Sequence, residues 1–313
     1  MRNIDRPACA ETASGACPAV IYVKLLLTAL FWGGTFVAGR IVSKNVGHFS
    51  IAFLRFLTAS LLLLVLTWRI EGRLPRLRAS QLVSIILLGL TGVFAYNAMF
   101  FKALQTIEAG RAALIVATCP VFITIASAIF FRERISLLKV FGIVISVSGA
   151  IVVVTRGSPR EAIEGGVGWG EFFIFCCVLS WVAYSLIGKS VMKDLSPLVA
   201  VTCSSVIGTG ALAVPALREG LIHNIPGHSM TDWLCVLYLG IFGTVIGFVW
   251  YYQAIKRIGP VKAGLFINFV PIFGVLLSFL VLREMITLSL AIGAVLVISG
   301  VYLTSRTHKT KAA

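Results

Sequence analysis

Charged residues are scarce in this sequence, and acidic ones are the scarcest. Asp, Glu, Lys and Arg together make up 12% of the 313 residues, whereas hydrophobic residues make up 58%. Soluble globular domains carry about twice that share of charged residues. The composition therefore excludes an ordinary soluble protein. It predicts an all-α integral membrane protein, because a helix satisfies its own backbone hydrogen bonds in lipid.

Motifs for metal binding, disulfide frameworks and catalysis are also missing. The seven cysteines include no Cys-x-x-Cys pair, and most fall in apolar stretches, where cysteine behaves as a small apolar residue. There is no His-Glu-x-x-His and no Gly-x-Ser-x-Gly motif. The near match Gly168-Trp169-Gly170-Glu171 has no membrane-embedded Asp to pair with, as an intramembrane protease would need. We therefore expect no enzyme, no metal site and no cofactor; a channel is a less favoured alternative.

What the sequence does contain is ten apolar segments, each about as long as a membrane-spanning helix, which needs roughly 20 residues. They are residues 20–42, 49–68, 80–101, 110–131, 136–155, 169–188, 198–217, 232–252, 262–282 and 286–305. Residues 1–19 lack the apolar run and the cleavage site of a signal peptide. We therefore expect 1–19 to be a cytoplasmic tail and the first span to stay as an anchor.

The second half of the chain repeats the first. Residues 89–151 align with 240–302 at a constant shift of 151, and the identical pairs include Gly92/Gly243, Pro120/Pro271, Arg132/Arg283, Glu133/Glu284 and Gly142/Gly293. A weaker match pairs Trp32 with Trp181. The pattern predicts two five-helix repeats, 20–155 and 169–305, a linker 156–168 and a cytoplasmic tail 306–313. Because five is odd, the second repeat enters the membrane from the opposite side, so the repeats are inverted.

Lysine and arginine are distributed unevenly between the two sides of the membrane. Ten spans place both termini on one side, and that side holds about twice as many Lys and Arg residues as the other. Cytoplasmic loops carry this excess, so we predict cytoplasmic termini and a location in the plasma membrane. This topology accounts for the formal net charge of +15 without a nucleic-acid partner. The sequence gives no prediction of oligomeric state.

Short motifs are distributed over both halves, and several of them recur at matching positions. They are Trp32-Gly33, Phe53-Leu54-Arg55-Phe56, Ala103-Leu104, Pro120, Arg132-Glu133-Arg134-Ile135, Gly168-Trp169-Gly170-Glu171, Ser180-Trp181, Ala254, Pro271 and Arg283-Glu284. Together the motifs resemble the drug/metabolite transporter superfamily, specifically its ten-helix EamA-type exporters, over almost the whole chain. The resemblance implies export of amino acids or related small metabolites by alternating access. It also implies a central cavity lined mainly by spans 1, 3, 4, 6, 8 and 9, with spans 5 and 10 more peripheral.

Nine residues are candidates for substrate binding, because each places a polar or aromatic group inside an apolar span, where contact with lipid is costly. They are Trp32, Thr35, Tyr96, Asn97, Thr118, Trp181, Tyr184, Trp250 and Asn268. Trp32 and Trp181 are deep and duplicated, unlike the tryptophans of an interfacial belt. The alternative roles are helix packing and hydrogen bonds between helices. Pro120 and Pro271 lie within spans and predict kinks beside Thr118 and Asn268.

No acidic residue is expected at the middle of a span. Those nearest the membrane fall at span ends, namely Glu133, Glu171, Asp232 and Glu284. A multidrug–proton exchanger needs a carboxylate in its pathway, so that function is an alternative rather than the first prediction. A nucleotide-sugar or phosphate carrier needs basic residues in the cavity, and only Arg55 and Lys102 are near enough. We expect Arg55 to pair with an acid or to extend outward to the membrane surface.

The topology can be tested by cysteine accessibility. We expect a cysteine introduced by Arg76→Cys to react with a membrane-impermeant thiol reagent only after the cytoplasmic side is exposed, because Arg76 lies in one of the predicted cytoplasmic loops. Labelling of position 76 from outside intact cells would contradict the predicted orientation.

Overall fold

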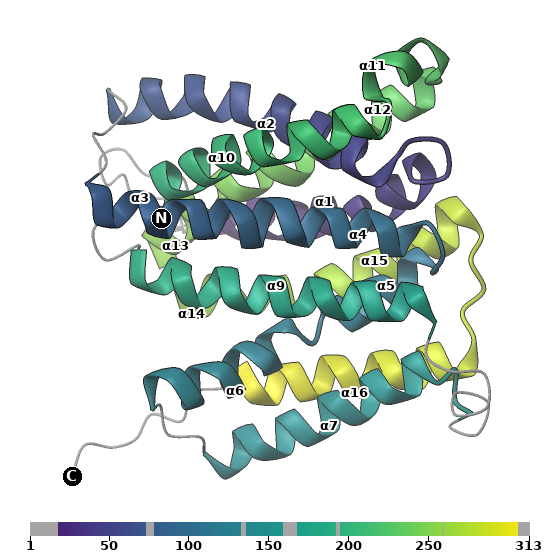
Figure 1. Ribbon diagram of the computed structural model, residues 1–313. Coiled ribbons are helices and arrows are strands. Elements are labelled where there is room, and N and C mark those ends of the chain that lie inside the picture. Colours follow the sequence, from purple (N-terminus) through teal and green to yellow (C-terminus); the bar gives the residue numbers. More distant parts are fainter. Residues whose placement is uncertain are drawn as a thin grey trace, which may run out of the picture.

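The computed structural model describes residues 18–72, 78–132, 136–158, 168–191, 195–258 and 260–305, and every regular element in these ranges is helical (Figure 1). Several sequence predictions fall outside the described residues. They are most of the tail 1–19, most of the linker 156–168, the tail 306–313, the loop with Arg76, and Glu133.

The described residues of the first half form seven α-helices and one π-helical segment. They are α1 (Pro18–Val42), α2 (His48–Glu71), α3 (Ala79–Leu88), the π-helix η1 (Gly89–Ala95), α4 (Tyr96–Leu104), α5 (Ala109–Val116), α6 (Cys119–Phe131) and α7 (Leu137–Val154).

The second half follows the same order after residue 168, with α11 and η2 as additional elements. It contains α9 (Trp169–Val191), α10 (Pro197–Arg218), α11 (Leu221–Asn224), the 3-10 helix η2 (Ile225–Gly227), α12 (Met230–Gly240), the π-helix η3 (Ile241–Ile246), α13 (Gly247–Ile258), α14 (Pro260–Ile267), α15 (Val270–Leu282) and α16 (Leu288–Ser305).

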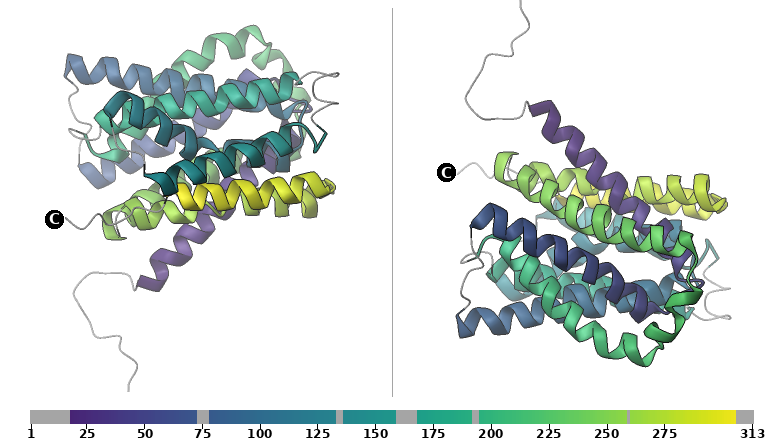
Figure 2. Two further views of the ribbon diagram at one scale, coloured as in Figure 1. Left: turned by 90° about the horizontal axis from the view of Figure 1, so that it is seen from below. Right: turned by 90° about the horizontal axis from the view of Figure 1, so that it is seen from above.

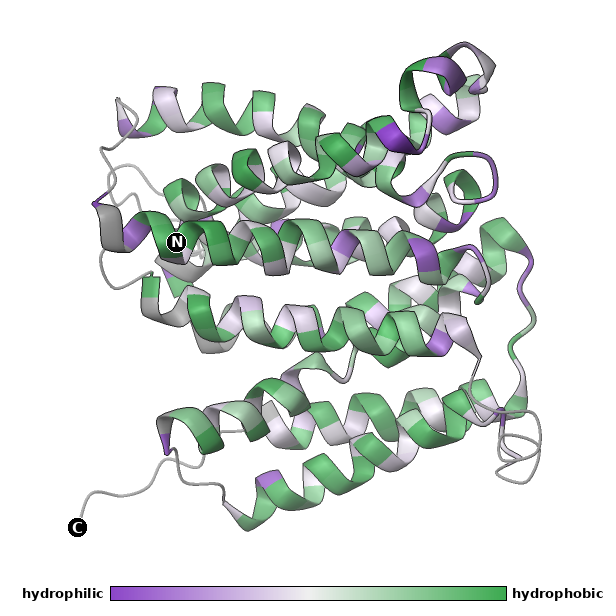
Figure 3. Cartoon of the chain, viewed as in Figure 1, coloured by the Kyte–Doolittle hydropathy of each residue, from purple (hydrophilic) through white to green (hydrophobic). Residues whose placement is uncertain are grey.

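Eight helical stretches of the described chain are long and apolar enough to cross a membrane, judged by length and composition. Val270–Leu282 and Leu288–Thr304 are shorter apolar helices in the positions of the ninth and tenth predicted spans. Figure 3 shows hydrophobic residues along the bodies of the helices and hydrophilic residues mainly near their ends. The outward side chains include large apolar ones such as Phe130 and Leu137, which are 74% and 78% exposed. The all-helical membrane fold is therefore as predicted.

Two predicted spans are broken helices rather than kinked ones. The fourth span divides into α5 and α6 around Thr118, and the ninth divides into α14 and α15 around Asn268. Pro120 and Pro271 lie in the first turn of the helix that follows each break. A proline has no N–H to donate and its ring obstructs the preceding turn, so each helix restarts at the proline instead of continuing through it.

The third and eighth spans each carry a π-helical segment that the sequence analysis did not predict. η1 begins at Gly89 and η3 begins directly after Gly240; these glycines are 151 residues apart and so occupy equivalent positions. A Cβ atom added at Gly92 would lie 2.1 Å from Tyr184, and one added at Gly243 would lie 2.6 Å from Thr35. The glycines therefore allow side chains of other helices to approach the backbone closely where the helix is widened. Such π segments are frequent at functional sites.

The two halves exchange their first helices. α1 packs against α12, α13 and α15 of the second half, whereas α9 packs against α3, α4, α5 and α6 of the first half. Equivalent helices also pair directly, since α2 packs along α10 and α7 packs along α16. These two pairs form opposite sides of the bundle, with the broken helices and the exchanged first helices between them (Figure 1). Figure 2 shows α1 crossing the bundle obliquely.

The α7–α16 pair depends on glycines that bring the two backbones together. A Cβ atom added at Gly300 would lie 2.4 Å from the Ser146 nitrogen, and one added at Gly142 would lie 2.7 Å from the Gly300 oxygen. Small residues allow helices to approach closely in lipid, where the hydrophobic effect does not drive them together.

We expect Gly300→Ala to destabilise the protein by about 1–3 kcal/mol, because the added methyl group forces α7 and α16 apart. Gly210→Ala is the matched control, since no atom lies within 4 Å of a Cβ added there. Thermal unfolding in detergent measures both variants. Equal unfolding temperatures for the two would contradict the close packing.

Candidate functional site

A cavity of about 160 Å³ lies inside the bundle and is lined by both halves of the chain. The first half contributes residues of α1, α2, α4, α5 and α6, and the second half contributes residues of α9, η3, α13, α14, α15 and α16. Both helix breaks open onto it, through Ala117 and Cys119 in the first half and Asn268 in the second. A cavity of about 150 Å³ holds a molecule the size of benzene. The space therefore suits a small molecule or part of a larger one.

Six aromatic side chains contribute to the lining of the cavity. Trp32 of α1 and Trp181 of α9 both face the cavity, and they are the duplicated tryptophans of the two repeats. The Trp32 indole donates a hydrogen bond to the Gly243 carbonyl oxygen at 3.0 Å, which anchors α1 to η3. The Trp181 ring lies 5.3 Å from the Tyr96 ring, measured between centroids. The walls therefore offer flat apolar surfaces held in fixed positions.

Arg55 of α2 also lines the cavity, although it is only 8% exposed. Its Nε donates to Thr244 Oγ1 at 3.1 Å, and its Nη1 donates to Asn97 Oδ1 at 3.0 Å. Asn97 belongs to the first half and Thr244 to the second, so one guanidinium connects the two halves at the cavity.

Asn97 is held by carbonyl groups of η1, and Thr244, which lies in η3, is held by a carbonyl group near the end of α12. Asn97 Nδ2 donates to the carbonyl oxygens of Val93 at 2.9 Å and Gly92 at 3.3 Å, and Thr244 Oγ1 donates to the Leu239 oxygen at 3.0 Å. A π-helical turn shifts the backbone hydrogen bonds by one residue and leaves carbonyl groups with spare capacity. The side chains use that capacity, and their acceptor atoms then point toward Arg55.

The structure places seven of the nine predicted residues at cavities. Trp32, Thr35, Tyr96, Trp181 and Asn268 line the main cavity. Asn97 and Tyr184 line an adjoining cavity of about 40 Å³, which shares Arg55, Tyr96 and Trp181 with the main one. The lining agrees with the spans implied by the resemblance and adds the second span through Arg55 and the tenth through Ile298 and Val301.

The other two predicted residues lie elsewhere. The Thr118 hydroxyl donates to the Ile115 oxygen at 2.6 Å, within the turn that ends α5. Trp250 packs against Phe31, with 5.9 Å between ring centroids, and lies beneath the Lys24 ammonium. Neither residue lines the main cavity. A substrate contact by either one would therefore need a different arrangement of the helices.

Arg55 is the residue that the sequence analysis did not include among the candidates. The sequence predicts that Arg55 pairs with an acid or extends to the membrane surface. The structure shows neither, because the side chain is buried and its hydrogen bonds go to the neutral groups of Asn97 and Thr244. Its position could have identified it as a candidate, because an ionisable residue inside an apolar span usually faces a cavity or another polar group.

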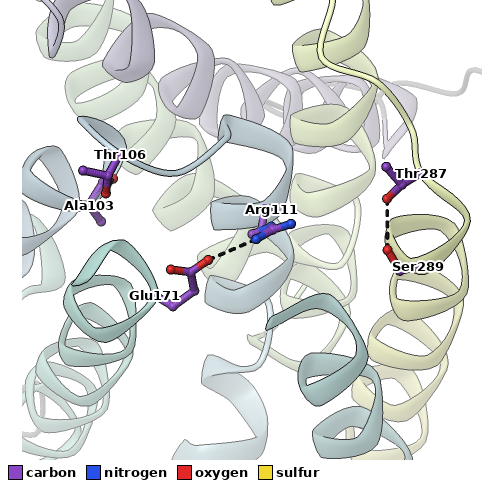
Figure 4. Close-up of polar contacts among 6 residues, drawn as sticks. All are labelled: Ala103, Thr106, Arg111, Glu171, Thr287 and Ser289. Atoms are coloured by element: carbon purple, nitrogen blue, oxygen red, sulfur yellow. Dashed lines mark hydrogen bonds and ion pairs between the residues drawn. The ribbon is translucent and has the colours of Figure 1, made fainter. Parts of the chain in front are cut away.

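Polar contacts connect the two halves at the end of the bundle opposite to the start of α1. Arg111 of α5 and Glu171 of α9 form an ion pair with 3.0 Å between Nη1 and Oε1 (Figure 4). The Glu284 carboxylate accepts hydrogen bonds from the backbone nitrogens of Ala109 at 2.9 Å and Gly110 at 3.0 Å, at the start of α5. A carboxylate is stabilised at a helix N-terminus, so Glu284 acts there as a cap across the two halves.

Glu219 makes a third contact of this kind, between the end of α10 and the start of α2. Its carboxylate accepts from the Ser50 nitrogen at 2.7 Å and lies 3.0 Å from His48 Nδ1. Burial raises the pKa of Glu219, but hydrogen bonds from His48 and Ser50 outweigh it and lower the pKa to about 2. The carboxylate is therefore ionised at neutral pH, and the contact persists there.

Comparisons with known proteins agree on the type of protein. The model of a family described as "EamA-like transporter family" matches twice, over residues 19–155 and 168–306. The "Uncharacterized transporter YyaM" of Bacillus subtilis (strain 168) is 33% identical, and the alignment covers 91% of this chain and 93% of that protein. The "Probable terminal-alkyne amino-acid exporter" of Streptantibioticus cattleyicolor is 25% identical, and the alignment covers 90% of this chain and 92% of that protein.

A solved crystal structure has the same fold. It superimposes with a TM-score of 0.61 at 19% identity and covers 92% of this chain and 98% of the other. At that identity the likeness concerns the fold alone.

We expect Asn97→Ala to destabilise the protein by about 1–3 kcal/mol, because it leaves a buried guanidinium nitrogen and the carbonyl groups of η1 without their partner. Asn224→Ala is the matched control, since Asn224 is exposed at the end of α11, makes no side-chain capping hydrogen bond, and should change stability by no more than about 0.5 kcal/mol. Unfolding of both variants in detergent tests this. If the two lost equal stability, the buried network would not be holding the site.

Proposed function

The chain belongs to the EamA-like transporter family, and on that premise we propose that it exports amino acids or related small metabolites by alternating access. In this proposal the substrate site is the central cavity between the two repeats. The repeats are the units 20–155 and 169–305, joined by the linker 156–168, and they rock against each other around the substrate.

The observation that carries the proposal is the shared lining of the cavity. Trp32 and Trp181, from equivalent positions in the two halves, face the same space. A site built from both repeats changes its shape when they move relative to each other. A molecule that binds such a site more tightly in one arrangement than in the other shifts the balance between arrangements.

The polar contacts at one end of the bundle support a gate there. The Arg111–Glu171 pair joins α5 to α9, and Glu284 joins the end of α15 to the start of α5. These contacts must break for the repeats to separate at that end. In the proposed topology, with cytoplasmic termini in the plasma membrane, they form the outer gate.

The chemistry of the cavity supports small, largely apolar metabolites. The described lining contains six aromatic side chains and no Asp or Glu, so it offers a lipophilic cation no charged partner. This disfavours the multidrug alternative. The relative from Streptantibioticus cattleyicolor is named as a probable amino-acid exporter, which fits a substrate with a small apolar side chain. Without a carboxylate in the described lining, the substrate gradient is the simplest driving force.

We expect Trp32→Ala to lower the rate of amino-acid counterflow in proteoliposomes about threefold to tenfold, because it removes an aromatic wall of the site and the hydrogen bond to Gly243. Trp68→Ala is the control, since Trp68 is 63% exposed at the end of α2.

Size-exclusion profiles and thermal unfolding should show similar amounts of folded protein for both variants. If Trp32→Ala lost folded protein in proportion to its lost transport, its role would be packing rather than substrate binding.

A further inference from the structure

Arg55 supplies a positive charge to a cavity that is otherwise apolar. Among the lining residues that the structure describes, it alone carries a formal charge at neutral pH. Its side chain is 8% exposed, and the surrounding walls include the aromatic rings of Trp32, Tyr96 and Trp181. Burying a cation among apolar groups is costly unless an anion or several hydrogen bonds compensate for the lost water.

The compensation within the protein is incomplete. Nε and Nη1 donate to the neutral acceptors of Thr244 and Asn97, and no described residue accepts a hydrogen bond from Nη2. The ion pairs of the described chain involve His48 with Glu219 and Arg111 with Glu171, and neither includes Arg55. The guanidinium is therefore held by two neutral acceptors and lies over the Phe56 ring, 5.3 Å from its centroid, while no carboxylate of the described chain pairs with its charge.

We propose that Arg55 is the anion-binding residue of the central cavity, and that the transported molecule is a monocarboxylate whose carboxylate pairs with this guanidinium. The apolar body of the molecule lies against the aromatic lining. This inference rests on the proposed function and makes it more specific, because it names the group by which the substrate is recognised. Arginine suits the role, since its planar donors match the two oxygens of a carboxylate.

The charge balance favours a carboxylate over a phosphate. A phosphate monoester carries a charge of about −1.5 to −2 at neutral pH, and a single arginine would leave part of it unpaired in an apolar cavity. A carboxylate carries one negative charge, so a single arginine leaves no unpaired charge in the cavity. The ammonium group of an amino acid gains no charged partner in the cavity, because the described lining contains no carboxylate. The carboxylate, and not the ammonium, is the group that decides binding.

Three ligands of nearly the same shape separate these contributions. Leucine has both charges, 4-methylpentanoate has only the carboxylate, and leucinamide has only the ammonium. Binding to the purified protein is measured by quenching of tryptophan fluorescence, and leucine counterflow is measured in proteoliposomes. We expect leucine and 4-methylpentanoate to bind, and leucinamide to bind about tenfold to a hundredfold more weakly, because it cannot form the charged hydrogen bonds.

Substitutions on α2 test the residue itself. Arg55→Gln should weaken binding of both carboxylates by the same factor and leave leucinamide unchanged, whereas Arg55→Lys should retain part of the preference because it keeps the charge. Arg69→Gln is the matched control, since it makes the same change at an exposed position on the same helix. That variant should behave like the wild-type protein.

The outcomes separate this inference from the proposed function. Leucinamide binding as tightly as leucine to the wild-type protein would overturn the inference without any variant, so it stays testable even if Arg55→Gln fails to fold. If Arg55→Gln still showed leucine counterflow and still preferred the carboxylates over leucinamide, the transport function would stand. The role of Arg55 would then be overturned. No leucine counterflow, but Arg55-dependent binding of 4-methylpentanoate, would remove the amino-acid substrate and retain the anion site.

Discussion

The buried guanidinium of Arg55 is the constraint around which the centre of this protein is arranged. A charge in an apolar interior must have fixed partners, and here they come from both halves of the chain, Asn97 and Thr244. Asn97 is held by carbonyl groups of the π-helical segment η1, and Thr244, within the π-helical segment η3, is held by the Leu239 carbonyl group just before that segment. The cation therefore links the widened turns of two helices, and the aromatic cavity forms beside it.

Duplication explains why this centre lies where it does. The π segments, the helix breaks before Pro120 and Pro271, and the tryptophans Trp32 and Trp181 each occur once per repeat. Because α1 and α9 are exchanged between the halves, both tryptophans reach the same cavity. The symmetry is incomplete at the cavity itself, since Arg55 comes from the first half alone. Both repeats therefore contribute aromatic walls to the cavity, but only one of them contributes a positive charge, which can pair with one anionic group.

Composition and periodicity were sufficient to predict the helical membrane class, the repeats and the helix disruptions at Pro120 and Pro271. Five of the nine predicted residues line the main cavity, because a polar or aromatic group deep in an apolar span is costly in contact with lipid and so tends to face the interior of the bundle. The π segments could not be predicted, since the glycines that permit them also permit ordinary close packing. Arg55 was not chosen because its partners, Asn97 and Thr244, are 42 and 189 residues away along the chain.

The central claim is that substrate binds through its carboxylate to Arg55, and a structure with 4-methylpentanoate or leucine bound tests it most directly. We predict that the carboxylate oxygens lie within hydrogen-bond distance of the Arg55 guanidinium and that the alkyl chain lies against Trp32 or Trp181. A ligand bound outside the central cavity, or bound inside it with its carboxylate away from Arg55, would contradict the account.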